Sequence, residues 1–134
     1  MAVLPDLDTS IYNILANDAG VAALVSAKIY NLQAPFGSAL PYLVFYEAVG
    51  IIPNITPRDT LDDTYRIESR AGTRAAASGL HLAVYTAVHE QALTITGWSN
   101  YWLVCERSQR FIENVDGAQY WRFVWDIRAM ASKD

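Results

Sequence analysis

Apolar side chains recur at every second position between Gln119 and Met130. Successive side chains of a β-strand point to opposite faces, so this pattern predicts a long strand with one face in a core. The predicted buried face carries Trp121, Phe123, Trp125, Ile127 and Ala129. The other face carries Arg122, Asp126 and Arg128. That polar face must meet water, a second subunit or a ligand, and which of these it meets is the functional question.

Three more strands follow from the same kind of pattern. Residues 63–71 alternate clearly, with one polar face formed by Thr64, Arg66, Glu68 and Arg70. Residues 41–47 are apolar on both faces, which predicts a central strand covered on both sides, or covered on one side and in a subunit contact on the other. Residues 101–112 form a strand with mixed alternation, and Asp116-Gly117 predicts a hairpin turn into the last strand.

Helical periodicity is confined to three segments. A first helix is expected from about residue 6 or 8 to Ala16 and a short second one over residues 21–26, separated by a stop at Gly20. The long helix is expected over residues 74–93, with Thr73 as its N-cap and a buried stripe rich in alanine. A short extended piece covers residues 28–31.

These elements predict an α+β fold. We expect a mostly antiparallel sheet of about four strands, with an N-terminal helix and one long helix packed on one face. Residues 1–134 are expected to form a single domain, because neither an internal repeat nor a linker interrupts the pattern.

One segment does not fit a solvent loop. Residues 49–62 hold two prolines, which forbid a continuous strand, but also Ile51, Ile52 and Ile55. We consider two interpretations: a loop that folds back on its own sheet, and an arm that packs on a neighbouring chain.

Composition narrows the class of protein. The chain of 134 residues is 52% hydrophobic and 18% charged, which is typical of a globular protein. Its formal net charge of −4, with no run of Lys or Arg, argues against duplex nucleic acid as the main partner. The single Cys105 excludes an internal disulfide and fits a reducing cytoplasm. Neither a secretion leader nor a membrane-spanning stretch is expected, so we predict a soluble intracellular protein.

The sequence offers little chemistry. His81 and His89 lie eight positions apart on the long predicted helix, about 12 Å by helical rise, which is too far to share one metal ion unaided. We interpret them as solvated helix-face residues. Cys105 lies in a predicted strand without a flanking motif, as a small core residue would. Gly72-Thr73-Arg74 could bind an anion through free amides, but an N-cap explains it better.

The remaining candidate functional residues are a group of carboxylates and the charged faces of two predicted strands. Asp59, Asp62 and Asp63 cluster beside Arg58, which favours a solvated loop with a local ion pair. The two polar strand faces, if adjacent in the sheet, could form cross-strand ion pairs and nothing more. They could equally be a polar contact surface or line a channel. We therefore expect no catalytic residue, no cofactor-binding residue and no metal ligand.

The chain as a whole resembles the phage tail completion family, also described as tail terminator or tail-to-head joining proteins of long-tailed phages. The resemblance rests on the run from Asn17 to Val25, then Lys28-Ile29-Tyr30, then a Pro/Gly loop leading to Leu40-Pro41-Tyr42. The strand Tyr65–Ser69, the helix after it and the closing hairpin also fit. The apolar segment 50–62 departs from the family pattern.

The resemblance implies a structural virion protein rather than an enzyme. Such a subunit assembles as a homo-hexameric ring on the tail tube, stops tube polymerisation and presents the surface that docks on the head connector. Its partners would be itself, the tail tube protein and the head–tail connector or stopper protein, with DNA passing through the lumen without sequence-specific binding and no membrane involved. It would be located in the tail or neck of the virion, after assembly in the host bacterial cytoplasm.

The ring hypothesis gives a use to the unexplained residues. Candidates for subunit or partner contacts are Tyr42, Val44, Tyr46, Ile51, Ile52 and Ile55. Candidates for a polar face toward the lumen are Arg66, Glu68, Arg70, Arg122, Asp126 and Arg128. Two alternatives remain: a head-completion or stopper protein of the neck, and a small ligand-binding or enzymatic domain that uses the His81, Tyr85 and His89 face.

Overall fold

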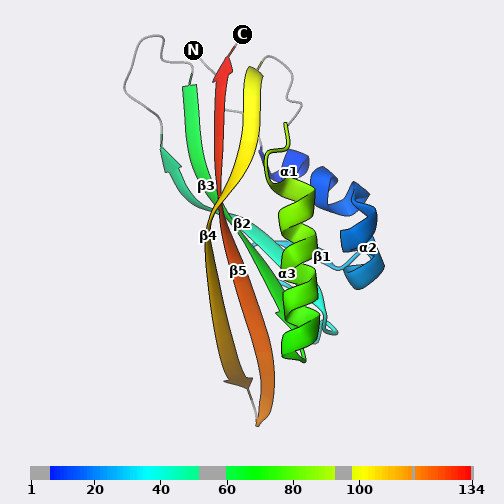
Figure 1. Ribbon diagram of the computed structural model, residues 1–134. Coiled ribbons are helices and arrows are strands. Elements are labelled where there is room, and N and C mark those ends of the chain that lie inside the picture. The colour runs from blue at the N-terminus through cyan, green and yellow to red at the C-terminus, as the bar shows by residue number, and fades with distance from the viewer. Residues whose placement is uncertain (1–6, 52–59, 93–97, 116, 134) are drawn as a thin grey trace.

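The computed structural model of the chain describes residues 7–51, 60–92, 98–115 and 117–133. Within these ranges three helices and five strands alternate in a mixed order (Figure 1). The helices are α1 (Leu7–Asn17), α2 (Ala19–Val25) and α3 (Arg74–Val88). The strands are β1 (Ile29–Asn31), β2 (Tyr42–Ile51), β3 (Thr60–Ala71), β4 (Trp98–Val115) and β5 (Ala118–Lys133). The α+β class predicted from the sequence is confirmed.

The strands form one sheet in the order β1-β2-β3-β5-β4. All neighbouring pairs are antiparallel except β1 and β2, which run parallel. We expected a mostly antiparallel sheet of about four strands, and the described residues form one strand more. The additional strand is the extended piece at residues 28–31, which is only three residues long and pairs with Leu43, Val44 and Phe45.

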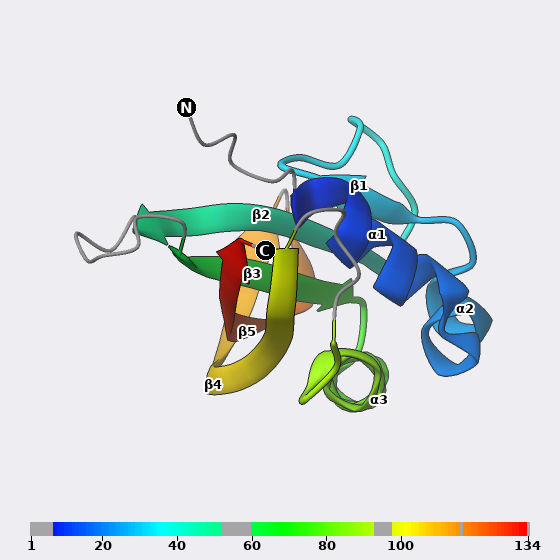
Figure 2. The ribbon, with the colours of Figure 1, turned by 90° about the horizontal axis from the view of Figure 1, so that it is seen from above.

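The helices lie on one face of the sheet, and no helix of the described residues lies on the other (Figure 2). Core side chains fill the space between these two layers, and they come from α1, α2, α3 and the inward face of every strand. The inward face of β5 is the one predicted, since Phe123, Ile127 and Ala129 are buried and Trp121 and Trp125 pack against the core. Strict alternation on β5 thus separates the molecule into a helix-covered face and an open face.

Polar contacts cap α2 and join α1 to the sheet. The Asp18 carboxylate caps α2 by accepting a hydrogen bond from the Val21 amide at 3.0 Å. The Asp8 carboxylate on α1 accepts hydrogen bonds from the Tyr65 hydroxyl of β3 at 2.7 Å and from the Asn31 amide of β1 at 2.9 Å. One side chain therefore ties the first helix to an edge strand and to a central strand.

Helix α3 ends at Val88, earlier than the expected Leu93, which lies outside the described residues. His89 leaves the helix with extended backbone, and Glu90 takes a positive φ of 59°. The segment after the helix then pairs with β4, because the Glu90 amide donates to the Leu103 carbonyl and the Leu103 amide donates to the Gln91 carbonyl. These long-range hydrogen bonds replace the last turn that periodicity alone would allow.

The loop expected over residues 49–62 is shorter in the structure, because strands occupy both of its ends. Strand β2 continues to Ile51 and β3 already begins at Thr60, so both ends of the segment belong to the sheet. Ile52 and Ile55, two of the predicted contact residues, lie outside the described residues, and of Ile51 only the backbone is described.

Candidate functional site

The open face of the sheet carries the polar positions that the sequence predicted, and the strand order brings them together. Strand β3 pairs with β5 so that Arg66 lies opposite Asp126 and Arg70 lies opposite Arg122. On the other side of β3, strand β2 places Tyr42 opposite Arg70, Val44 opposite Glu68 and Tyr46 opposite Arg66. The predicted contact residues of β2 and the predicted polar residues of β3 and β5 therefore form one continuous surface.

Glu68 is the centre of this surface. It is only 4% exposed although no described helix covers it, because the side chains around it close over its carboxylate. The carboxylate accepts a hydrogen bond from the Tyr46 hydroxyl at 2.7 Å and from Arg70 Nη2 at 2.8 Å, and Arg122 Nη1 lies 3.5 Å away. A buried carboxylate with two guanidinium partners is compensated in charge and hydrogen bonding.

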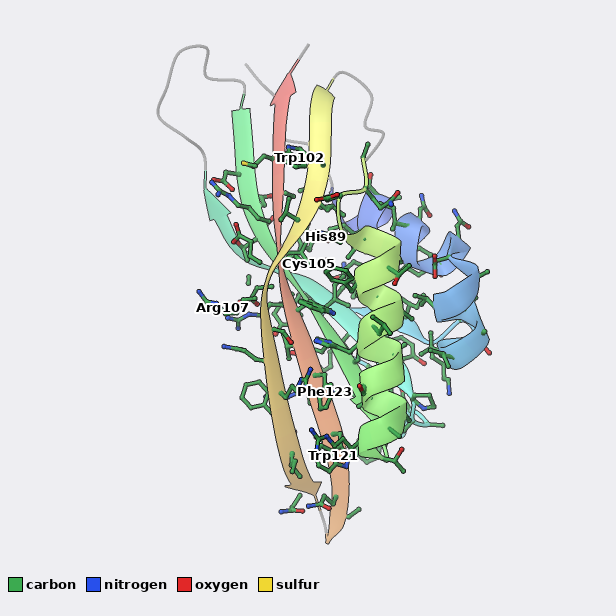
Figure 3. The ribbon with its side chains drawn as sticks, viewed as in Figure 1. His89, Trp102, Cys105, Arg107, Trp121 and Phe123 are labelled. Atoms are coloured by element: carbon green, nitrogen blue, oxygen red, sulfur yellow. The ribbon has the colours of Figure 1, made fainter. Side chains whose placement is uncertain are left out.

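A second pair crosses from β3 to β5. The Arg66 guanidinium donates to Asp126 Oδ1 at 2.9 Å, and Arg107 of β4 lies 3.9 Å from the other oxygen of the same carboxylate. The side chain of Asp126 is 10% exposed, whereas Arg66 and Arg107 reach solvent. In Figure 3, Arg107 points away from α3, to the open side of the sheet.

The network continues along the hairpin of β4 and β5. Arg122 donates to Glu113, which also accepts a hydrogen bond from the Tyr120 hydroxyl at 2.6 Å. The bonds from Tyr120 and Arg122 hold the pKa of the Glu113 carboxyl below its usual value. The Arg122 guanidinium also lies over the Phe111 ring, 4.4 Å from its centroid. Sequence reasoning missed Glu113 and Tyr120, although counting back from the two-residue turn places both beside Arg122.

Arg128 forms the ion pairs at the other end of the open face, near the start of β3 and the end of β5. Its guanidinium donates two hydrogen bonds to the Asp62 carboxylate, at 2.9 and 2.7 Å, and Glu106 lies 3.7 Å away. The hydrogen bonds from Arg128 lower the pKa of Asp62. Asp62 thus pairs across the sheet with Arg128, and the predicted pair with Arg58 involves a residue outside the described ones. Of the loop carboxylates, Asp59 also lies outside the described residues and Asp63 is buried in β3.

Apolar side chains flank the charged surface at one end. The segment between β1 and β2 exposes Leu32, Phe36 and Leu40, and Phe36 is fully exposed. This segment borders a hollow of about 290 Å³ that Tyr42, Val44 and Arg70 also line. Val44 itself is only 2% exposed, so its own side chain offers little free area.

The histidines lie on the helix-covered side, and His81 is not the solvated residue that was expected. It is 5% exposed and stacks on Trp125 with ring centroids 4.2 Å apart. Its Nε2 lies 2.8 Å from the Ser108 hydroxyl, whereas Nδ1 has no hydrogen-bond partner among the described residues. Burial, with a smaller effect of Arg110, lowers the pKa of His81 to about 4. The helix turns this residue inward because it follows Leu80 and precedes Val84 on the buried stripe.

His89 and Cys105 contact each other through a hydrogen bond that connects the end of α3 to β4. The Cys105 amide donates to His89 Nδ1 at 3.1 Å, and burial raises the pKa of the Cys105 thiol to about 12. Figure 3 places His89 and Cys105 at the middle of the molecule, between α3 and β4. In the part of the chain that the structure describes, His, Cys, Asp and Glu form no group of three that could hold a metal ion. The described helices are also too short or too polar to cross a membrane.

Comparisons with known proteins agree with this architecture. The chain folds like a protein from a solved structure titled "Virion of native gene transfer agent (GTA) particle", with a TM-score of 0.70, 21% sequence identity and 94% of each chain covered. None of the curated proteins compared with the chain matches it. The sequence profile of the family described as Tail completion protein gp17 matches residues 9–132, which is nearly the whole chain. The chain therefore belongs to the tail completion protein gp17 family, and it is a structural protein of the bacteriophage tail.

Proposed function

We propose that this chain closes the phage tail tube. In this proposal, copies of the chain assemble as a homo-hexameric ring on the end of the tube, stop its polymerisation and form the surface that docks on the head connector or stopper protein. The ring stands at the tail–neck junction of the virion and is assembled in the host cytoplasm. No catalysis is assigned to it.

The observation that carries the proposal is the paired state of the open sheet face. Each of Arg66, Arg70, Arg122 and Arg128 has a carboxylate partner within the same chain. A guanidinium that is already paired attracts phosphate less than a free one, and a face of mixed charge lacks the continuous positive potential that holds nucleic acid. We assign this face to the lumen, where DNA has to pass without being retained.

The apolar residues beside the network are assigned to contacts between neighbouring subunits. A closed ring needs two different surfaces on each subunit that fit one another. Leu32, Phe36 and Leu40 form an exposed apolar group next to Tyr42, where solvation is unfavourable and burial in a neighbour is favourable. Tyr42 lies at the boundary between this group and the network, and Tyr46 contacts Glu68 within the network, with Val44 between the two tyrosines along the strand. Ile51, Ile52 and Ile55 remain proposed contact residues.

The proposal is tested by asking whether the chain caps growing tail tubes in vitro. Purified tail tube protein is polymerised with and without the chain, and tube lengths and tube ends are measured by electron microscopy. Native mass spectrometry over a concentration series gives the number of subunits in free solution, and classes of tube ends give the number in the cap. Tubes whose lengths do not change, and whose ends carry no ring, would contradict the capping function.

The lumen assignment needs a separate variant. The double substitution Arg66→Glu and Arg122→Glu breaks the central pairs and makes the face acidic, so slower DNA delivery by assembled particles is expected. The matched control is Arg74→Glu, which changes an exposed arginine at the start of α3, on the other side of the sheet. If the double variant assembles and delivers DNA as the control does, the face does not line the lumen.

A further inference from the structure

Among the described residues, no strand or loop pairs with the outer edge of β4 over its second half. Strand β4 is the last strand of the sheet on this side, and its first half is covered because Glu90 and Gln91 pair with Leu103. From Arg107 to Val115 no hydrogen bond from the described residues reaches the outer side of the backbone. In Figure 1 this part of β4 runs along the free side of the lower hairpin. A long free edge is a template for another extended strand.

The register identifies which amides are free. Strand β5 is regular, and its residues Arg122, Val124 and Asp126 lie opposite Phe111, Gln109 and Arg107. The backbone N–H and C=O groups of Leu103 point to the outer edge, where Gln91 and Glu90 bind them. The extra residue Glu106, in the bulge between Cys105 and Arg107, then shifts the alternation of outward-pointing backbone groups by one residue. After the bulge, the residues whose N–H and C=O groups point outward are therefore Ser108, Arg110, Ile112 and Asn114.

The other edge of the sheet cannot serve as the partner. Strand β1 is only three residues long, and the chain turns back on it at both ends. The Ile29 amide donates to the Ala27 carbonyl, and the Asn31 carbonyl accepts from the Gln33 amide, so its outward groups are partly used. Copies of the chain therefore cannot pair β4 to β1 in an open series, and the edge that fits β4 of one copy is β4 of another.

The side chains select a register for that pairing. Centring two antiparallel copies on Arg110 would place the two Arg110 side chains opposite each other, which is unfavourable for like charges. Centring them on Ser108 would require the part of the edge that the segment after α3 already covers. Centring them on Ile112 places Arg110 opposite Asn114 and Phe111 opposite Glu113, without opposed like charges. It also covers Ile112, which is 50% exposed in the single chain, and Phe111, which is 38% exposed.

We propose that the free protein forms a two-fold dimer through antiparallel pairing of β4 with β4, centred on Ile112. The amides of Arg110, Ile112 and Asn114 on each strand donate to carbonyls of the other strand. This contact is isologous, whereas subunits of a ring that all point the same way along a tube use heterologous contacts. The dimer is thus a form of the protein that is not yet assembled, and it goes beyond the proposed capping function.

The experiment is sedimentation velocity of the full chain over a concentration series, with three variants. Ile112→Lys puts two like charges at the centre of the contact, so the dissociation constant of the dimer is expected to rise by roughly tenfold or more. Asn114→Pro removes an outward amide that the monomer does not use, and it is expected to weaken the dimer while leaving the fold intact. Leu82→Lys is the matched control, because it changes an exposed leucine of α3 and is expected to leave the dimer unchanged.

Hydrogen exchange gives an independent reading of the same contact. The amides of Arg110, Ile112 and Asn114 are expected to become protected as the concentration rises, in the wild-type chain but not in Ile112→Lys. A chain that is monomeric at every concentration, or a dimer that Ile112→Lys and Asn114→Pro leave unchanged, overturns the proposal. A free hexamer that Ile112→Lys leaves intact also overturns it, and that result would at the same time support the ring.

Discussion

Replacing His81 with phenylalanine tests the buried histidine between α3 and the hairpin. The structure places its ring against Trp125, 5% exposed, with a pKa of about 4. In the unfolded chain the same ring has a pKa of about 6.5. As the pH falls below 6.5 the unfolded state binds a proton, whereas the folded state does not until the pH approaches 4. The contribution of His81 to the free energy of unfolding is therefore fully present above pH 6.5 and is lost as the pH falls from 6.5 toward 4.

The magnitude follows from the difference between the two pKa values. Each unit of difference is about 1.4 kcal/mol, so the full loss due to His81 is roughly 3 kcal/mol, and about 2 kcal/mol of it falls between pH 7 and pH 5. His81→Phe removes the titrating group and keeps an aromatic ring against Trp125. The Ser108 hydroxyl that it leaves is exposed and can bond to water.

Urea denaturation at pH 7, 6 and 5 measures this difference. Between pH 7 and pH 5 the wild-type chain is expected to lose about 2 kcal/mol more stability than His81→Phe. His89→Gln removes the other histidine, and persistence of the loss in that variant assigns it to His81. If the wild-type chain and His81→Phe lose the same stability over this interval, the histidine is not held neutral by burial and the reasoning is refuted.

Three further substitutions test the core, the network and the turn. Phe45→Ala removes one of the largest fully buried side chains and is expected to destabilise the fold by roughly 3–5 kcal/mol, measured from the urea midpoint; a loss below 1 kcal/mol would contradict its place in the core. Glu68→Gln removes the buried charge that Arg70 and Tyr46 contact, and a loss of roughly 1–3 kcal/mol that shrinks in high salt is expected. Gly117→Ala places a Cβ at a φ of +78°, so a loss of roughly 1 kcal/mol is expected in thermal unfolding, whereas Gly72→Ala, a glycine with open space around it, serves as its control.

The sequence patterns were most informative where one periodicity held over a whole element. The alternation on β3 and β5 predicted both the buried and the open face, because each strand has a regular register from end to end. The buried stripe of α1 was equally clear, with Leu7, Ile11 and Leu15 all in the core. The sequence therefore identified six charged residues of the open face, but not Glu113 of β4, and the strand order then paired them.

The predictions failed where long-range contacts decide the local structure. The extended piece predicted at residues 28–31 is a strand, but it was not counted in the sheet, because three residues are too few to show a periodicity and its pairing with β2 is a long-range contact. The end of α3 is set by hydrogen bonds to β4, about twelve to sixteen residues further along the chain, which no helix signal contains. His81 was expected in solvent because its type suggested a polar position, whereas the ring is held inside by Trp125 and Phe123.

The alternation of β4 is mixed because its register with β5 shifts twice, between Ser99 and Trp102 and between Cys105 and Arg107, and the second shift bears on how relatives of this protein should be compared. Glu106 is the extra residue at the second shift, and the side chains from Arg107 to Val115 take their side of the sheet from their regular register with β5. Deleting this single residue would make Cys105 and Arg107 regular neighbours on opposite faces, so Phe111 and Glu113 would stay on the open side and Ile112 on the helix-covered side. In an alignment, a gap at position 106 therefore marks the loss of a bulge and not an exchange of two surfaces, and relatives that differ only by this gap are expected to present the same side chains on each face of their hairpins.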